Sequence, residues 1–333
     1  MTGPVFLTGA TGFIGGALLE RLLADGTEVR VLVRGGDAAE LMQHLGAVPV
    51  AGDLLGEADL APAMAGCRLV FHAAGLNHFC LPDPKPLFRV NVEGTVRLVE
   101  AAARAAVPRL VYTSSAATLG ESQGSIGTEN SDHRGWFLSA YERSKYLAER
   151  AAVRAASSQG LELICLNPAS VQGPGRASGT ARWLIRYANG RLRWMIQTRV
   201  SLVDIADCTE AHILAAGRGV PGRRYVISGP TRPIGDLIQI VGSVTGRKYP
   251  VRYLPAAPAI ALGSVAGSVF KALGRRPPVC REMMRTLAFG HAYDGSAAAR
   301  ELGFAYTPIE TSVRRAMHWY SEQGYLQPPL AAS

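Results

Sequence analysis

The most constraining feature of the sequence is a glycine-rich turn close to its start. Residues 4–8 form a β-prone run, and Gly-Ala-Thr-Gly-Phe-Ile-Gly follows directly at 9–15 and opens a helical stretch. In such a turn the first glycine permits a tight bend, the second lets a pyrophosphate approach the backbone, and the third lets the helix pack close to the sheet. Free amides at the start of the helix would face the phosphates. The predicted dinucleotide contacts are Gly9, Thr11, Gly12, Phe13, Ile14 and Gly15.

The first half of the chain alternates short β-branched runs with helical stretches rich in alanine and leucine. Strands are predicted at 4–8, 29–33, 48–51, 69–72, 110–113 and 161–166. Helices are predicted near 13–25, 37–45, 57–65, 86–106 and 139–158. This alternation predicts an α/β fold, a Rossmann-type doubly wound parallel sheet with helices on both faces.

The chain is expected to divide into two parts near residue 168. After that point the alternation gives way to loops rich in Gly, Pro and Arg, followed by scattered helices. We predict an NAD(P)-binding domain over 1–168, to which 204–228 returns. The segments 169–203 and 229–333 would form a smaller C-terminal substrate-binding portion. A chain of 333 residues has room for two units of this kind.

The ends of the second and third strands bear on which dinucleotide binds. A domain that prefers NAD has an Asp or Glu after the second strand to hold the ribose diol, whereas this chain has Arg34. A guanidinium can bind the 2′-phosphate of NADP, so we expect NADP(H) to be preferred and NAD(H) to be possible. A solvated arginine is the alternative. Asp53 follows the third strand and either accepts a hydrogen bond from the adenine amino group or forms an ordinary Asx turn.

Composition argues against several classes of protein. Lys and Arg number 35 against 26 Asp and Glu, which gives a net charge of +9. The arginines are spread along the chain, so we expect a small anionic molecule as the ligand and no nucleic acid. No apolar run reaches the ~18–20 residues that span a bilayer, and we expect no transmembrane segment. The first residues lack a leader-like pattern, so no cleaved leader is expected.

Cysteine and histidine usage gives no sign of a metal site. The five cysteines are Cys67, Cys80, Cys165, Cys208 and Cys280. No Cys-x-x-Cys pair is present to hold zinc or a redox disulfide, a pattern that fits a reducing, cytoplasmic compartment. His72 and His78 have no carboxylate or cysteine at ligand spacing, so we predict no metal ion.

A candidate catalytic pair lies on the helix that follows the fifth predicted strand. Tyr141 and Lys145 are four residues apart and therefore share one helix face. The preceding strand ends in Tyr-Thr-Ser-Ser at 112–115, at the sheet edge where ligands of such folds bind. A phenol with a pKa near 10 is a weak acid–base group at neutral pH, and a nearby ammonium favours its phenolate. No Gly-x-Ser-x-Gly motif points to a serine hydrolase.

Over nearly its whole length, the chain resembles the extended short-chain dehydrogenase/reductase family. Members of this family are similar to NAD-dependent epimerases and dehydratases. The motifs are TGATGFIG at 8–15, GDL at 52–54, HAAG at 72–75, NVEGT at 91–95, YTSSAATLG at 112–120, YERSK at 141–145 and NPASVQGPG at 167–175. The resemblance implies a catalytic triad of Ser115, Tyr141 and Lys145, with Ser114 a weaker candidate for the serine. Asn91 would lie behind the nicotinamide, or would be a buried amide with a structural role.

The resemblance also implies what these residues do. Tyr141 would pass a proton to or from the substrate oxygen, Ser115 would orient that oxygen, and Lys145 would hold the nicotinamide ribose. Tyr141 and Lys145 thus also count as cofactor contacts. The remaining implied cofactor contacts are Leu54, Ala73, Ala74, Gly75 and Pro168. The implied assembly is a homodimer that pairs the helices near 86–106 and 139–158.

The motifs fit some branches of the family better than others. Sugar-nucleotide dehydratases carry an Asp-Glu pair after the active-site serine or threonine, and this chain has Ala116 and Ala117 there. The run LNPASVQGP at 166–174 looks more like dihydroflavonol 4-reductases and 3β-hydroxysteroid dehydrogenases than like sugar-nucleotide epimerases. We therefore expect an NADP(H)-dependent oxidoreductase that interconverts a ketone or aldehyde and an alcohol on a mainly apolar small molecule.

Two alternatives stay open. A nucleotide-sugar epimerase would need to hold a diphosphate, and an arginine-rich stretch could do so or could form a solvated basic face. Its members are Arg176, Arg182, Arg186, Arg191, Arg193 and Arg199. The second alternative is a non-catalytic NADP-sensing module on the same fold, against which the retained Tyr141 and Lys145 argue. The segments 76–87 and 119–138 flank the expected pocket and would decide the substrate.

Overall fold

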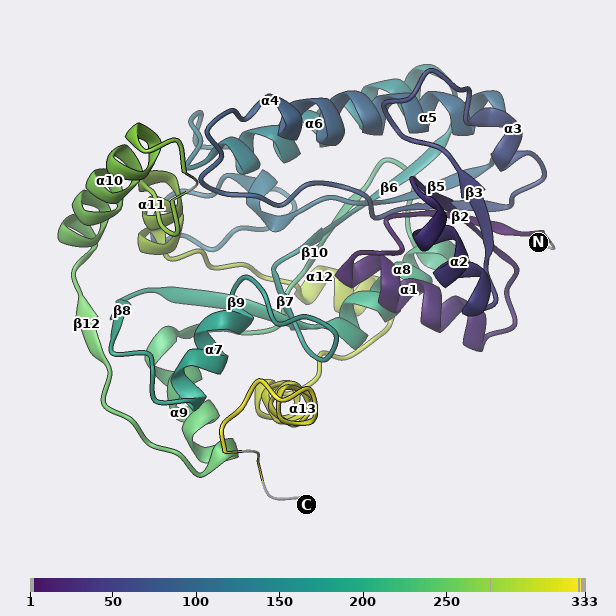
Figure 1. The fold of residues 1–333 in the computed structure, drawn as a ribbon. Coiled ribbons are helices and arrows are strands. Elements are labelled where there is room, and N and C mark those ends of the chain that lie inside the picture. Colours follow the sequence, from purple (N-terminus) through teal and green to yellow (C-terminus); the bar gives the residue numbers. More distant parts are fainter. Residues whose placement is uncertain (1–2, 276, 329, 331–333) are drawn as a thin grey trace.

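The computed structural model describes residues 3–275, 277–328 and 330. Its centre is a parallel sheet with the strand order β10-β6-β5-β4-β1-β2-β3 (Figure 1). These strands are β1 (Val5–Thr8), β2 (Val29–Val33), β3 (Val48–Ala51), β4 (Leu69–His72), β5 (Arg109–Thr113), β6 (Glu162–Pro168) and β10 (Arg224–Ile227). The chain builds outward from β1 in one direction and then from β4 in the other, as in doubly wound sheets. The predicted fold class is confirmed.

Helices cover both faces of this sheet (Figure 1). One face carries α1 (Phe13–Ala24), α2 (Gly36–His44), α8 (Ile205–Arg218) and α12 (Ser296–Leu302). The other carries α3 (Ala61–Met64), α4 (Lys85–Phe88), α5 (Thr95–Arg104) and α6 (Ala140–Ser158). Ala148, Ala152 and Ala156 recur every four residues on α6 and are at most 1% exposed, so α6 lies close against the strands.

One predicted helix is interrupted. The stretch near 86–106 forms α4, then a π-helical segment, η1 (Arg89–Gly94), and then α5. A π-helical turn inserts an extra residue into the helix, and such turns often mark functional positions. Hydrophobic periodicity gives no sign of this interruption, because the extra residue changes the backbone register locally.

The rest of the chain packs at the carboxyl edge of the sheet. Its strands are β7 (Ser170–Gln172), β9 (Arg199–Asp204) and β11 (Thr231–Pro233) in one small sheet, and β8 (Trp194–Ile196) and β12 (Arg252–Leu254) in another. Its helices are α7 (Ala181–Ala188), α9 (Ile234–Thr245), α10 (Ala256–Ala272), α11 (Arg281–Phe289) and α13 (Ile309–Glu322). In the first part of the chain, a short 3₁₀ turn, η2 (Ala116–Leu119), follows β5. Among the described residues, no helix combines the length and apolarity needed to cross a membrane.

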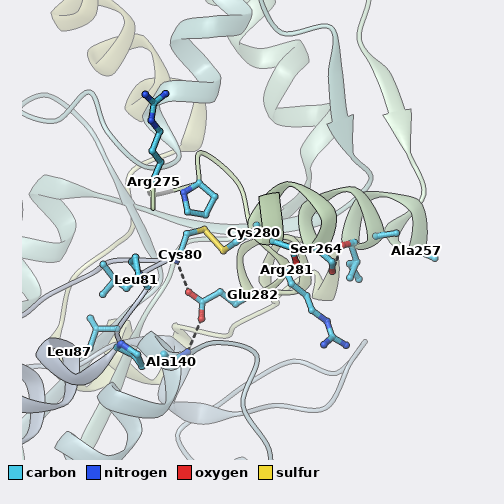
Figure 2. Close-up of a pocket in the computed structure, with 17 residues that line it drawn as sticks. Cys80, Leu81, Leu87, Ala140, Ala257, Ser264, Arg275, Cys280, Arg281 and Glu282 are labelled. Carbon is cyan, nitrogen blue, oxygen red and sulfur yellow. Dashed lines mark hydrogen bonds between the residues drawn. A yellow bond between two sulfur atoms is a disulfide. The ribbon is translucent and has the colours of Figure 1, made fainter. Parts of the chain in front are cut away.

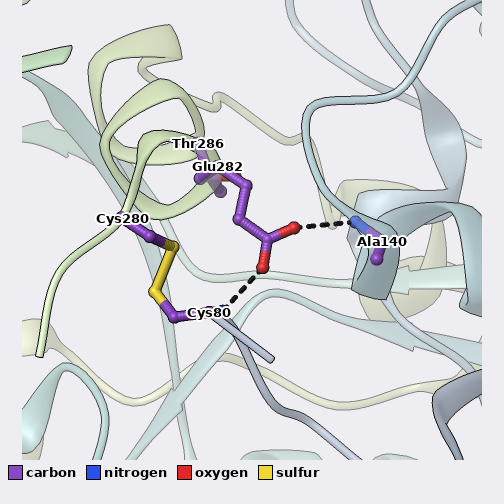
Figure 3. The surroundings of a disulfide bond; sticks show 5 residues. All are labelled: Cys80, Ala140, Cys280, Glu282 and Thr286. Atoms are coloured by element: carbon purple, nitrogen blue, oxygen red, sulfur yellow. Dashed lines mark hydrogen bonds between the residues drawn. A yellow bond between two sulfur atoms is a disulfide. The ribbon is translucent and has the colours of Figure 1, made fainter. Parts of the chain in front are cut away.

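A disulfide joins the two parts of the chain. Cys80 lies in the loop after β4 and Cys280 lies just before α11, and they are bonded across 200 residues of sequence (Figure 3). The absence of a Cys-x-x-Cys pair therefore did not exclude a disulfide, because spacing in the sequence does not say which thiols meet in space. Disulfides persist in oxidising surroundings, so the argument from cysteines for a reducing cytoplasm no longer holds.

Candidate active site

The glycine-rich turn lies between β1 and α1, at the carboxyl end of the sheet. Gly9 has a φ of +81°, and a Cβ there would lie 2.5 Å from the backbone nitrogen of Ala74. A Cβ on Gly15 would overlap the carbonyl oxygen of Gly9, so only glycine lets α1 approach this closely. Gly12 is the N-cap of α1, and no side chain caps this helix start. The first amides of the helix are therefore available to phosphate oxygens, which fits a dinucleotide.

A buried hydrogen-bond chain supports this turn from β4. The Thr8 hydroxyl and His72 Nδ1 are 2.7 Å apart, and His72 Nε2 and the Thr95 hydroxyl are 2.9 Å apart. Burial lowers the pKa of His72 to about 3, and the charge of Lys145 acts in the same direction. The Thr8 hydroxyl also accepts a hydrogen bond from the Ala74 amide at 3.3 Å. His72 is thus a neutral residue that fixes the loop 73–75 beside the glycine turn.

The residues predicted to select the nucleotide, which follow β2 and β3, have different surroundings. Arg34 is exposed directly after β2, and no hydrogen bond or ion pair joins it to another described residue. Added Cβ atoms on Gly35 and Gly36 would meet no atom within 4 Å, so space surrounds the arginine. Asp53 Oδ1 accepts a hydrogen bond from the Leu55 amide at 2.8 Å, which is an Asx turn. Leu54 is buried.

Tyr141 lies in the first turn of α6, and its hydroxyl interacts with the side chain of Ser115, just after β5. Its ring lies 5.8 Å from that of Phe79, which belongs to the loop after β4. Burial raises the pKa of Tyr141, and the interaction with Ser115 and the charge of Arg176 partly oppose this rise. The structure therefore brings Ser115 and Tyr141 together and keeps the phenol protonated at neutral pH.

Lys145 lies one turn further along α6 and points to β5. Its Nζ donates hydrogen bonds to the Tyr112 hydroxyl and to the Thr113 carbonyl oxygen, both at 2.9 Å. Burial lowers the pKa of Lys145 to about 8, while the charge of Glu149 acts to raise it. The expectation that this ammonium holds the pKa of Tyr141 down is not met, because burial has the larger effect and the ammonium is engaged with β5.

The two adjacent serines have different surroundings. Ser114 is buried, and its hydroxyl donates to a carboxylate oxygen of Glu149. Ser115 is the N-cap of η2, and its hydroxyl accepts a hydrogen bond from the Ala117 amide at 3.3 Å. The geometry therefore favours Ser115 over Ser114 as the serine that faces Tyr141.

Asn91 lies in the π-helical segment η1 and is 1% exposed. Its Nδ2 donates to the Leu76 carbonyl oxygen at 3.0 Å and to the Ser144 hydroxyl at 2.9 Å, and its Oδ1 accepts from the Leu76 amide at 2.7 Å. The amide thus ties the loop after β4 to α6 between Tyr141 and Lys145. Each of its polar atoms has a protein partner, as in the structural alternative for this residue.

One residue near the site, Glu149, was missed by the sequence prediction. Glu149 is buried one turn after Lys145 and forms an ion pair with Arg224 of β10 at 2.6 Å. Its carboxylate also accepts a hydrogen bond from Asn167 at 2.6 Å, so it links α6 to β6 and β10. The spacing of four residues from Lys145 on the same helix face was the available signal.

Arg176, the first member of the predicted arginine-rich stretch, lies beside the site. Its guanidinium lies 5.0 Å from the centroid of the Phe13 ring, beside the glycine turn, and its charge lowers the pKa of Tyr141. It is partly buried. The other arginines of the predicted stretch are exposed, namely Arg182, Arg186, Arg191, Arg193 and Arg199.

A cavity of about 920 Å³ lies beside the start of α6 (Figure 2). Its walls are the loop 80–87, α10 and the segment 275–282, and most of its lining side chains are apolar. Glu282 crosses one end, where its carboxylate accepts hydrogen bonds from the amides of Cys80 at 2.6 Å and Ala140 at 3.1 Å. Ala140 directly precedes Tyr141, so the cavity adjoins the turn that carries the phenol. The segment 119–138, also predicted to flank the pocket, contributes no lining residue.

Residues 5–228 match the NAD dependent epimerase/dehydratase family, which is well over half of the chain. The chain belongs to this family. It is 32% identical to a putative dihydroflavonol 4-reductase of Synechocystis sp., with 98% of this chain and 97% of the relative covered. It is 29% identical to sterol demethylase protein B of Methylococcus capsulatus, with 96% and 99% covered. The crystal structure of gox2253 is similar with a TM-score of 0.85 and 31% identity, covering 98% of this chain and all of that one.

Membership of this family classes the protein as an extended short-chain dehydrogenase/reductase. It is an NAD(P)-dependent oxidoreductase, in agreement with the reductases among its relatives.

Proposed function

We propose that this protein is an NADP(H)-dependent reductase that interconverts a ketone or aldehyde and an alcohol on a mainly apolar small molecule. The observation that carries this proposal is the meeting of Ser115 and Tyr141, with Lys145 one turn away, beside a mainly apolar cavity. The dihydroflavonol 4-reductase and sterol demethylase names of two relatives support an apolar substrate.

The proposed chemistry assigns one task to each side chain of the triad. In the direction of reduction, Tyr141 donates its proton to the substrate oxygen, and its raised pKa keeps that proton in place at neutral pH. Ser115 orients the same oxygen through its hydroxyl. The positive charge of Arg176 stabilises the phenolate that donation leaves behind. NAD(P)H, when bound, supplies the hydride.

The remaining residues of the site bind the cofactor or keep the loop after β4 in place. Lys145 presents its ammonium to the nicotinamide ribose, and Asn91 keeps the loop after β4 in place against α6. The glycine turn binds the pyrophosphate, Arg34 the 2′-phosphate, and Asp53 and Leu54 the adenine end. The other proposed cofactor contacts are Thr11, Phe13, Ile14, Ala73, Ala74, Gly75 and Pro168.

The same proposal divides the chain by task. Residues 1–168 together with 204–228 would bind the cofactor, and 169–203 with 229–333 would bind the substrate. Most of the cavity wall comes from 257–282, which agrees with this division. The protein would act as a homodimer.

The proposal is tested by following NADPH and NADH oxidation against a panel of apolar ketones, beside UDP- and dTDP-sugars. We expect NADPH oxidation with at least one apolar ketone, and its loss in Tyr141→Phe. Conversion of a nucleotide sugar alone would identify an epimerase, for which Arg176 would be the diphosphate ligand. Tight cofactor binding without oxidation by any compound would identify a sensing module.

A further inference from the structure

Helix α10 presents an apolar face that the described residues leave uncovered. Leu262, Val265 and Val269 are 62%, 64% and 51% exposed, and Leu273, just beyond the helix, is 64% exposed. Spacings of three and four residues place all four side chains on one side of the helix. In Figure 1 the helix lies at the outer edge of the molecule. An uncovered apolar strip of this kind marks an interaction surface.

The opposite side of α10 packs on α11. A Cβ on Gly263 would lie 2.5 Å from Met284 Cγ of α11, so the absence of a side chain there lets the two helices approach closely. This contact fixes which side of α10 faces outward. The exposure of the strip therefore follows from the packing of α10 on α11.

The segment of the chain that contains this strip carries charge of one sign. Residues 237–281 contain no Asp or Glu. The cations in this stretch are Arg247, Lys248, Arg252, Lys271, Arg275, Arg276 and Arg281. Arg252, Arg275 and Arg281 are exposed. The next acidic residue, Glu282, is bonded to the amides of Cys80 and Ala140.

Two exposed aromatic side chains lie on the pair of strands that leads into the helix. Tyr253 is 41% exposed on β12, which leads directly into α10, and Trp194 is 51% exposed on the paired strand β8. The Arg252 guanidinium lies 5.4 Å from the centroid of the Trp194 ring. Trp, Tyr and Arg are residues that lipid–water interfaces favour, because each joins an apolar body to a polar end.

The same helix also forms a wall of the cavity. Ala261 and Ser268 line the cavity and are exposed at the same time, so the cavity reaches the surface at these residues. Both are neighbours of the exposed strip on the helix surface, since Val265 lies four residues after Ala261 and three residues before Ser268. The opening of the cavity therefore borders the apolar strip.

We propose that α10 docks on the surface of an anionic lipid bilayer, with its exposed strip among the acyl chains and the arginines on the lipid phosphates. A bilayer of this composition matches both the apolar strip and the single sign of charge along residues 237–281. The cavity then opens toward the lipid and takes its apolar substrate from there. This last step rests on the proposed function, whereas the docking itself does not.

The docking is tested by flotation of the purified protein with vesicles of phosphatidylcholine containing phosphatidylglycerol, without cofactor or substrate. Leu262→Ser with Val269→Ser removes apolar area from the strip, and Leu45→Ser with Val220→Ser is the matched control, at sites 46% and 51% exposed elsewhere. We expect binding about tenfold weaker for the first double variant and unchanged for the control. All four side chains are exposed, and equal melting temperatures would confirm intact folds.

A second pair of variants tests the contribution of charge to vesicle binding. Arg275→Gln is expected to weaken binding to the anionic vesicles and to reduce its salt dependence, while Arg154→Gln, exposed on α6, leaves both unchanged. Pure phosphatidylcholine vesicles are expected to bind the protein weakly. Equal vesicle binding by wild type and the α10 double variant would overturn the proposal. Loss of a dimer in that variant, without vesicle binding by the wild type, would show that a second copy covers the strip.

A second measurement separates the docking from the proposed function. For a ketone dissolved in the vesicles, the α10 double variant should raise KM about tenfold and leave kcat unchanged; for a short water-miscible ketone it should change neither. Vesicle binding without turnover of any ketone would refute the function and leave the docking standing. Turnover of both ketones with equal KM in variant and wild type would refute delivery from the lipid.

Discussion

Lys145 Nζ donates a hydrogen bond to the Tyr112 hydroxyl at 2.9 Å. The acceptor is fully buried, and its ring stacks on His72 with centroids 5.3 Å apart. The lysine of the Tyr-x-x-x-Lys pair is therefore held by β5, while the Tyr141 hydroxyl interacts with Ser115. Because burial lowers the pKa of Lys145 to about 8, its charge changes within the pH range in which the enzyme would be assayed.

Tyr112→Phe should move the alkaline limb of the pH profile to lower pH. The substitution removes an acceptor of the Lys145 ammonium, which disfavours its charged form and lowers its pKa further. A neutral hydrogen-bond acceptor contributes about 1 kcal/mol. We therefore expect the midpoint of the alkaline limb to shift by roughly half a pH unit to one pH unit, in the pH profiles of both kcat/KM and cofactor affinity. Tyr146→Phe, on the helix that carries Lys145, is the control. An unmoved alkaline limb would show that Tyr112 does not support the charge.

Tyr141→Phe should abolish turnover and leave cofactor affinity nearly intact. The ring and its contact with Phe79 are kept, and only the proton-donating hydroxyl is lost. We expect a loss of at least about 100-fold in kcat with a change in cofactor Kd of less than about twofold. Lys145→Ala should impair both quantities. Turnover of Tyr141→Phe within a few-fold of wild type would remove the phenol from the mechanism.

Arg34→Ala should weaken NADP(H) binding and leave NAD(H) binding unchanged. The guanidinium is exposed beside two glycines, free to form a charge-assisted contact with a 2′-phosphate. Such a contact corresponds to roughly 10- to 150-fold in affinity. Arg154→Ala, exposed on α6, serves as the control in titrations of both cofactors. A wild type that prefers NAD, or equal NADP affinity in the two proteins, would refute the assignment.

Cys280→Ser should lower the free energy of unfolding. The disulfide to Cys80 closes a loop of 200 residues, and removing such a link costs about 2–5 kcal/mol. Denaturant unfolding with and without a thiol reductant measures the effect, because reductant should destabilise the wild type and not the variant. Cys67→Ser changes a cysteine outside this bond and is the control. Free thiols at both positions in the untreated protein would contradict the prediction.

The homodimer should form through α5 and α6. Leu147 and Val153 are 36% and 37% exposed on α6, and a partner helix would cover them. Light scattering at micromolar concentration is expected to give a dimer for the wild type and a monomer for Val153→Arg. The Leu262→Ser, Val269→Ser variant should stay dimeric. A monomeric wild type would exclude this assembly.

Local pattern was sufficient to predict the central sheet. The predicted bounds of β2, β3 and β4 agree with the structure residue for residue. Strands of a parallel sheet covered on both faces are short apolar runs, and the helices between them repeat every 3.6 residues, so each element is encoded by adjacent residues. The glycine turn is local in the same sense, because Gly9 and Gly15 are required by a bend of a few residues.

Contacts between distant residues were decided by the tertiary structure alone. Lys145 meets Tyr112 across 33 residues, and Cys80 meets Cys280 across 200. Neither pairing has a signature in spacing, because it depends on how the helices and loops pack against the sheet. The same holds for the apolar strip of α10. Its sequence is apolar on every side, and only packing on α11 determines that Leu262 and Val265 face outward while Gly263 faces in.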